Sequence, residues 1–152
     1  MRRDFFFRLV SLVFLVQATF FVCNHPSSYA AGSNGCIEDS NDCIIAGNEA
    51  VKKGDVDKAI EFYNKAASLD AQNLNAIIGL GHLYAQKGNI DKAIESFNKA
   101  ISLNAKDPNA YVGLGDLYLQ KGDKDAALKQ HKILSGLNKN LAKELYKRIQ
   151  SS

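Results

Sequence analysis

The sequence predicts an all-α fold, a solenoid of three helix-turn-helix repeats followed by a C-terminal capping helix. Two observations carry this prediction. Residues of one type recur every 34 positions from about residue 40 onward, and the apolar residues inside each recurring unit follow helical spacing. A third observation, the different composition of residues 1–30, separates this opening segment from the repeats.

The composition is that of a globular protein, with 46% hydrophobic and 23% charged residues among 152. A net charge of +3 is too balanced for a protein that binds nucleic acid by neutralising phosphates. Three Cys and three His, widely scattered, are too few for a zinc site. We therefore expect no nucleic-acid partner, no metal and no cofactor.

Residues 1–30 have the pattern of a secretory signal peptide. A positive start at Arg2 and Arg3 precedes an apolar stretch over residues 9–23, and Ser28-Tyr29-Ala30 offers small residues for cleavage. The apolar stretch is shorter than the about 20 residues that span a bilayer. We expect an exported protein, periplasmic or secreted, with a flexible tail over residues 31–39. The alternative is an uncleaved N-terminal anchor.

The period is most visible in the turns, which are Lys53-Gly54-Asp55, Lys87-Gly88-Asn89 and Lys121-Gly122-Asp123. It divides the chain into three repeats, over residues 40–73, 74–107 and 108–141. In the middle repeat, Asn73 suits an N-cap and Gly88 suits the left-handed residue that ends a helix. Asp91 then places a negative charge at the start of the second helix. Apolar positions at helical spacing are Ile77, Leu80, Gly81 and Tyr84, then Ala93, Ile94, Phe97, Ala100 and Ile101.

The third repeat opens with Pro108 behind Asp107, where the missing N–H of proline has no cost. After it, a final helix over residues 142–152 is expected to cover the exposed end of the stack. Its apolar stripe is Leu141, Leu145, Tyr146 and Ile149, and its polar side carries Lys143, Glu144, Lys147 and Arg148.

These repeats resemble the tetratricopeptide family. The matching positions of the middle repeat are Leu80, Gly81, Tyr84, Ala93, Phe97 and Ala100. The departures are Cys43 and His131 in place of aromatic residues, and Ala71, Ala105 and Lys139 in place of proline. The resemblance implies a right-handed solenoid without enzymatic activity that binds proteins or peptides, and no small-molecule substrate.

The resemblance also implies a concave groove lined by the first helix of each repeat. Four rows of equivalent positions should line it: Asn41, Asn75 and Asn109; Ile44, Ile78 and Val112; Asn48, His82 and Asp116; and Val51, Ala85 and Leu119. The asparagines of the first row can instead be helix caps. His82 and Asp116 could hydrogen-bond across neighbouring helices.

One subclass of the family holds the terminal carboxylate of chaperone tails with Lys, Asn and Arg side chains. Only Asn48 matches that arrangement here. The other clamp positions are occupied by Ile44, Gly79, Asn109 and Gly113. We therefore expect a groove for an apolar helix or an extended peptide rather than a carboxylate clamp.

Cys36 and Cys43 are expected to form a disulfide, because an exported protein meets an oxidising compartment. The alternative is that Cys43 is a buried thiol at a core position. No arrangement of nucleophile and base with a known signature accompanies them.

We interpret the protein as an assembly or scaffolding factor of the cell envelope, with at most transient membrane contact. Two alternatives remain. The acidic excess of residues 36–57 and the basic excess of residues 126–152 could support self-association into a structural protein. The chain could also be a non-catalytic subunit of an envelope complex.

Overall fold

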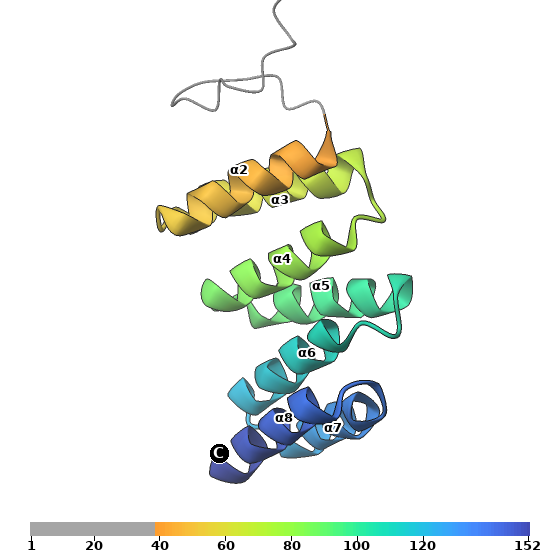
Figure 1. The fold of residues 1–152 in the computed structure, drawn as a ribbon. Helices are drawn as coiled ribbons and strands as arrows, with labels where there is room; N and C mark the ends of the chain where they lie inside the picture. Colours follow the sequence, from red (N-terminus) through yellow and green to blue (C-terminus); the bar gives the residue numbers. More distant parts are fainter. Residues whose placement is uncertain (1–38) are drawn as a thin grey trace, which may run out of the picture. The chain divides into compact units, whose positions relative to one another are not determined.

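The structure is a computed structural model that describes residues 39–152. The predicted signal peptide, residues 31–38 of the predicted tail and Cys36 lie outside the described residues, whereas Asp39, the last residue of that tail, caps α2. The described part is helical throughout and contains no strand (Figure 1). Its helices are α2 (Ser40–Lys52), α3 (Val56–Leu69), α4 (Leu74–Gln86), α5 (Ile90–Leu103), α6 (Pro108–Gln120), α7 (Lys124–Leu137) and α8 (Lys139–Ser151).

The helices pack as consecutive pairs, α2 with α3, α4 with α5 and α6 with α7, and each pair contacts the next (Figure 1). We call α2, α4 and α6 the A helices, and α3, α5 and α7 the B helices. Successive A helices contact one another, and α6 also contacts α8, whereas the described B helices make no such contact with each other. The A helices therefore lie on the inner side of the stack, and the predicted all-α solenoid is confirmed.

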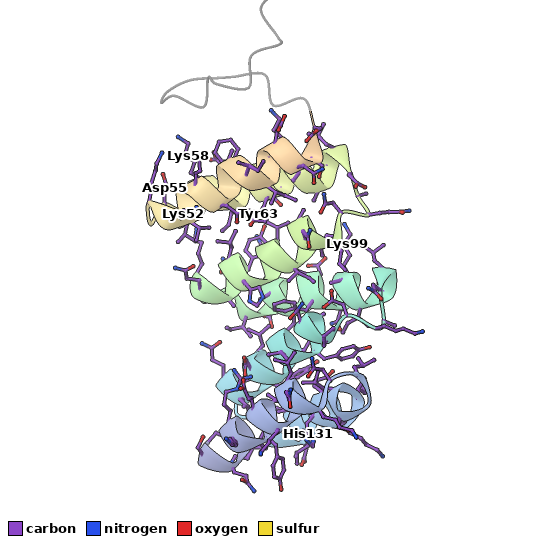
Figure 2. All side chains as sticks on the ribbon, in the orientation of Figure 1. Lys52, Asp55, Lys58, Tyr63, Lys99 and His131 are labelled. Atoms are coloured by element: carbon purple, nitrogen blue, oxygen red, sulfur yellow. The ribbon has the colours of Figure 1, made fainter. Side chains whose placement is uncertain are left out.

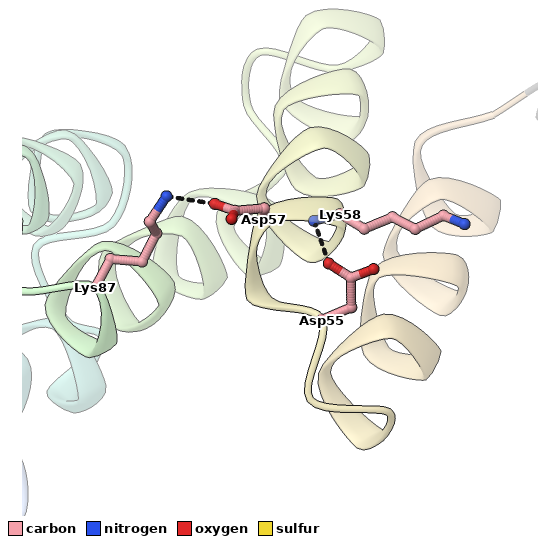
Figure 3. Close-up of polar contacts among 4 residues, drawn as sticks. All are labelled: Asp55, Asp57, Lys58 and Lys87. Atoms are coloured by element: carbon pink, nitrogen blue, oxygen red, sulfur yellow. Dashed lines mark hydrogen bonds and ion pairs between the residues drawn. The ribbon is translucent and has the colours of Figure 1, made fainter.

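The helix ends use the residues that the sequence predicted. The side chain of Asn73 accepts a hydrogen bond from the backbone N–H of Ala76 at 3.1 Å and caps α4. Asp107 caps α6 directly before Pro108. Gly88, with φ of 75°, lies in the left-handed region that only glycine adopts without cost. Figure 3 shows the same capping at α3, where the carboxylate of Asp55 accepts from the backbone N–H of Lys58 at 3.0 Å.

One buried aromatic ring on each of α3 and α5 fixes how the repeats stack. A β-carbon added to Gly47 on α2 would stand 2.7 Å from the ring of Tyr63, and one added to Gly79 on α4 would collide with the same ring. Tyr63 therefore lies between two successive A helices (Figure 2). Because these glycines lack side chains, the helices approach the ring closely enough to bury it.

In the third repeat, a side chain of α8 takes the place of the buried aromatic ring. His131 occupies the aromatic position and lies half-buried against Tyr146 of α8, with ring centroids 5.1 Å apart. The space beside Gly115 is filled by Leu145, which would stand 2.6 Å from a β-carbon there. The last helix therefore supplies the large side chain that the third repeat lacks.

The capping helix differs from the prediction in its start and its buried side. It begins at Lys139, capped by Asn138, three residues before the expected start at residue 142. Tyr146 was expected in the buried stripe but is 42% exposed, and Ala142 is buried instead. The reason is that the ring of Tyr146 packs on the half-buried His131, whereas Leu145 enters the core.

Exposed ion pairs repeat along the stack. Lys87, which follows α4, pairs with Asp57 in the first turn of α3 (Figure 3). Lys121 pairs in the same way with Asp91 at 3.2 Å, one repeat later. Exposed pairs of this kind contribute little stability each. None of the helices within residues 39–152 has the length and apolarity needed to cross a membrane.

Candidate functional site

The first predicted row, Asn41, Asn75 and Asn109, is exposed on the A helices. The alternative that these asparagines cap the helices is wrong. The side chains that cap α2, α4 and α6 belong to Asp39, Asn73 and Asp107, two residues earlier in each case. Within residues 39–152 the side-chain amides of the row make no hydrogen bond, so each can donate to and accept from a partner.

The second row is apolar and half-buried. Ile44, Ile78 and Val112 each pack against a different core cluster and still present part of their surface to solvent. Ile78 lies in the middle repeat, between the other two. The fourth row extends this apolar character, because Val51 is 41% exposed while Ala85 and Leu119 are half-buried.

The third row is already engaged by the protein itself. The side-chain oxygen of Asn48 accepts a hydrogen bond from the hydroxyl of Tyr63 at 2.7 Å. The ring of His82 packs edge-on against Phe97, with centroids 5.1 Å apart. Asp116 accepts a hydrogen bond from the guanidinium of Arg148 on α8 at 3.0 Å.

Within the described residues no hydrogen bond joins His82 and Asp116: Asp116 accepts from Arg148, and the ring of His82 packs against Phe97. Arg148, expected on the polar outer side of the last helix, reaches back to α6 instead. The sequence pattern did not reveal this contact between α8 and α6. The side chains of the third row thus make contacts within the protein. They are less available for a binding partner than the side chains of the first row.

The electrostatics of this row follow from its packing. Desolvation against the neighbouring helices lowers the pKa of His82 below its ordinary value of 6.5, and the charge of Asp116 opposes this shift. Burial raises the pKa of Asp116, against the opposing effects of Arg148 and His82. His82 is therefore mostly uncharged at neutral pH, and its imidazole can both donate and accept a hydrogen bond.

Cys43 is completely buried in the first core cluster, with Ala59, Tyr63 and Ala66. Burial raises the pKa of its thiol, so little of the reactive thiolate is present at neutral pH. Its predicted partner, Cys36, lies outside the described residues, so the disulfide stays a prediction. The complete burial of Cys43 agrees with the alternative interpretation, in which Cys43 is a thiol at a core position.

Three of the positions that a carboxylate clamp would need cannot supply its polar side chains. Gly79 and Gly113 receive the rings of Tyr63 and Phe97, so no side chain can project from them without displacing a ring. Ile44 is apolar and half-buried. The structure thus adds a physical reason to the sequence argument against a clamp.

Comparison with known proteins assigns these repeats to a family. Residues 81–122 match a family model described as "TPR repeat", and residues 50–100 match one described as "Tetratricopeptide repeat". A search of curated protein sequences found no significant relative.

Several solved structures share the fold. The TPR domain of Arabidopsis OM64 is 23% identical, with a TM-score of 0.70 over 77% of this chain and 98% of that one. The first TPR domain of Spaghetti (RPAP3), bound to an HSP90 peptide SRMEEVD, is 24% identical, with a TM-score of 0.67 over 77% and 97%. MamA is 30% identical, with a TM-score of 0.64 over 69% and 61%.

Proposed function

Because the chain belongs to the tetratricopeptide-repeat family, we propose that it binds another protein or a peptide on its A-helix face. This face consists of the four rows described above. The observation that carries the proposal is the first row, in which three equivalent asparagines are exposed beside an apolar row and have no partner within the described residues. Repeat arrays use such extended surfaces for binding.

The chemistry of the face favours an extended peptide or an amphipathic helix. The amides of the first row match the N–H and C=O groups of a peptide backbone, and the apolar rows match aliphatic side chains. His82, largely uncharged, adds one further hydrogen-bonding group. An acidic peptide tail such as SRMEEVD, which the Spaghetti domain holds, would find no Lys or Arg in the first two rows of this chain.

The packing of the two described histidines supports a non-enzymatic role. His82 lies against Phe97, and His131 lies against Tyr146. Among the described residues, no hydroxyl or thiol that either ring could activate is hydrogen-bonded to it. Within residues 39–152 no group of three His, Cys, Asp or Glu side chains could hold a metal ion.

We place this binding activity outside the cytoplasm, in the assembly or scaffolding of the cell envelope. The support is the sequence of residues 1–30, with its positive start, short apolar stretch and small residues before Ala31.

Affinity capture from native envelope with matched baits tests the proposal. The wild-type protein should retain a partner that the Ile78→Asp variant loses, because the new charge lies at the centre of the apolar row. Ile133→Asp is the control, since Ile133 is 45% exposed on α7, a B helix. A partner that Ile78→Asp retains as well as wild type does would contradict binding on the A-helix face.

A further inference from the structure

The first A helix differs from the others at the positions that face a preceding repeat. On α4, Ala76 and Leu83 are buried in a core cluster with residues of the first repeat, and Gly79 lies against Tyr63. On α6 the equivalent residues are Ala110, Gly113 and Leu117, which contact the second repeat. Small and apolar residues at these positions therefore form the joint between repeats.

On α2 the same three positions hold Asp42, Ile45 and Glu49. Within residues 39–152 no repeat precedes the first one, and Ile45 is 45% exposed. The two carboxylates lie about one helical turn before and after Ile45, on the same side of the helix. We call these three residues the N-end face: an exposed aliphatic side chain between two acidic ones.

The opposite end of the stack has a complementary surface. His131, labelled in Figure 2, occupies the position at which Tyr63 and Phe97 face the following repeat. Tyr146 of α8 lies against it, with ring centroids 5.1 Å apart. Tyr146 is 42% exposed, and the exposed side chains of Lys143 and Lys147 flank it on the same helix. We call Tyr146, Lys143 and Lys147 the C-end face.

We propose that copies of this chain associate head to tail, with the N-end face of one copy on the C-end face of the next. Ile45 would contact Tyr146, while Asp42 and Glu49 would lie near Lys143 and Lys147. Each face is an apolar centre with charged neighbours, and the charges of the two faces are opposite. Such an interface joins two different surfaces, so it can extend into a chain of copies.

This association goes beyond the proposed function, because it uses the ends of the stack and leaves the A-helix face of every copy open. The paired surfaces are small, and their charges are exposed. The interaction should therefore be weak and should weaken further in high salt, which screens exposed charges over distances of about 10 Å at 0.1 M.

Two charge variants test the proposal, in the full protein purified with the amino terminus that it has in the cell. Asp42→Asn/Glu49→Lys makes both ends basic, and Lys143→Glu/Lys147→Glu makes both ends acidic. By sedimentation, wild type should show a mass that rises with concentration at low salt and returns to the monomer at high salt. Each variant alone should remain monomeric, whereas an equimolar mixture should associate again, since every basic end then meets an acidic one.

Thermal unfolding by circular dichroism shows whether each variant is folded, and Ile133→Asp serves as a control that should associate like wild type. The proposal is overturned if wild type stays monomeric at all concentrations, or if each charge variant associates as wild type does. It is also overturned if folded variants fail to associate on mixing.

Discussion

The ring of Phe97 on α5 fills the space beside Gly81 on α4, where an added β-carbon would stand 2.8 Å from the ring atom Cζ. The same ring leaves no room for a β-carbon at Gly113 on α6. One side chain thus determines how closely α5 approaches α4 within its repeat and α6 across the joint to the next repeat. The recurrence of a small residue and an aromatic one therefore has a direct packing reason.

Gly81→Ala should destabilise the protein by about 1 to 3 kcal/mol, the usual cost of overpacking a core. Phe97 is only 1% exposed, so its ring has no free space into which to move. Denaturant unfolding measures the change. An undiminished free energy of unfolding would mean that the contact between α4 and α5 is not as described.

Gly136→Ala is the matched control for this experiment. Gly136 lies in α7, and an added β-carbon there would meet nothing within 4 Å. Alanine is the better helix former, so this variant should be neutral or more stable by up to about 1 kcal/mol. A loss of stability as large as that of Gly81→Ala would show that helical glycines matter here for a reason other than ring packing.

Stability should depend on pH through His82. Its pKa is lowered by desolvation in the folded protein, so the folded state binds the proton less readily than the unfolded chain, whose histidine titrates near 6.5. The contribution of neutral His82 to the free energy of unfolding is therefore fully present above about pH 6.5. It is lost as the pH falls from that value through the lower pKa of the folded state.

His82→Asn, which introduces the residue that repeat 1 has at position 48, removes this titration. Between about pH 7 and pH 5, the free energy of unfolding of the variant should fall less than that of wild type. Parallel curves for the two proteins would show that His82 has the same pKa in both states.

The disulfide prediction is tested by mapping peptides of exported protein without reductant. A single linked peptide containing Cys36 and Cys43 is expected. If Cys43 is instead a free core thiol, its burial and raised pKa should make it resist alkylation until the protein unfolds. Rapid alkylation of both cysteines in the folded protein fits neither account.

Export is tested by the intact mass of the protein from its own host. Removal of residues 1–30 should leave Ala31 as the first residue. A protein that still carries Met1 would support the uncleaved anchor and would contradict cleavage.

The sequence was sufficient to predict features that depend on local chemistry. The cap at Asn73, the left-handed Gly88 and the stacking of helix pairs follow from spacing and residue type, and they are confirmed. The exposure of the first row also follows from the period. These features repeat every 34 residues, so each copy supports the interpretation of the others.

What the sequence did not reveal depends on contacts between elements that do not repeat. The pairing of Asp116 with Arg148 and the insertion of Leu145 beside Gly115 depend on how α8 packs against α6. The use of Asn48 by Tyr63 requires the side-chain geometry of two helices. The one sequence signal for this contact is that repeat 1 has Tyr63, which carries a hydroxyl, where repeat 2 has Phe97, together with the polar Asn48 on the preceding helix.

The central claim is that the A-helix face binds the partner, and titration of a captured partner by calorimetry tests it most directly. Ile78→Asp should weaken binding by about 2 kcal/mol or more, roughly thirtyfold in Kd, because central apolar residues supply much of the binding energy of an interface. Lys143→Glu/Lys147→Glu should leave the affinity unchanged, and it preserves the contact of Arg148 with Asp116. The account is contradicted if the charge variant loses the partner while folded Ile78→Asp binds it like wild type.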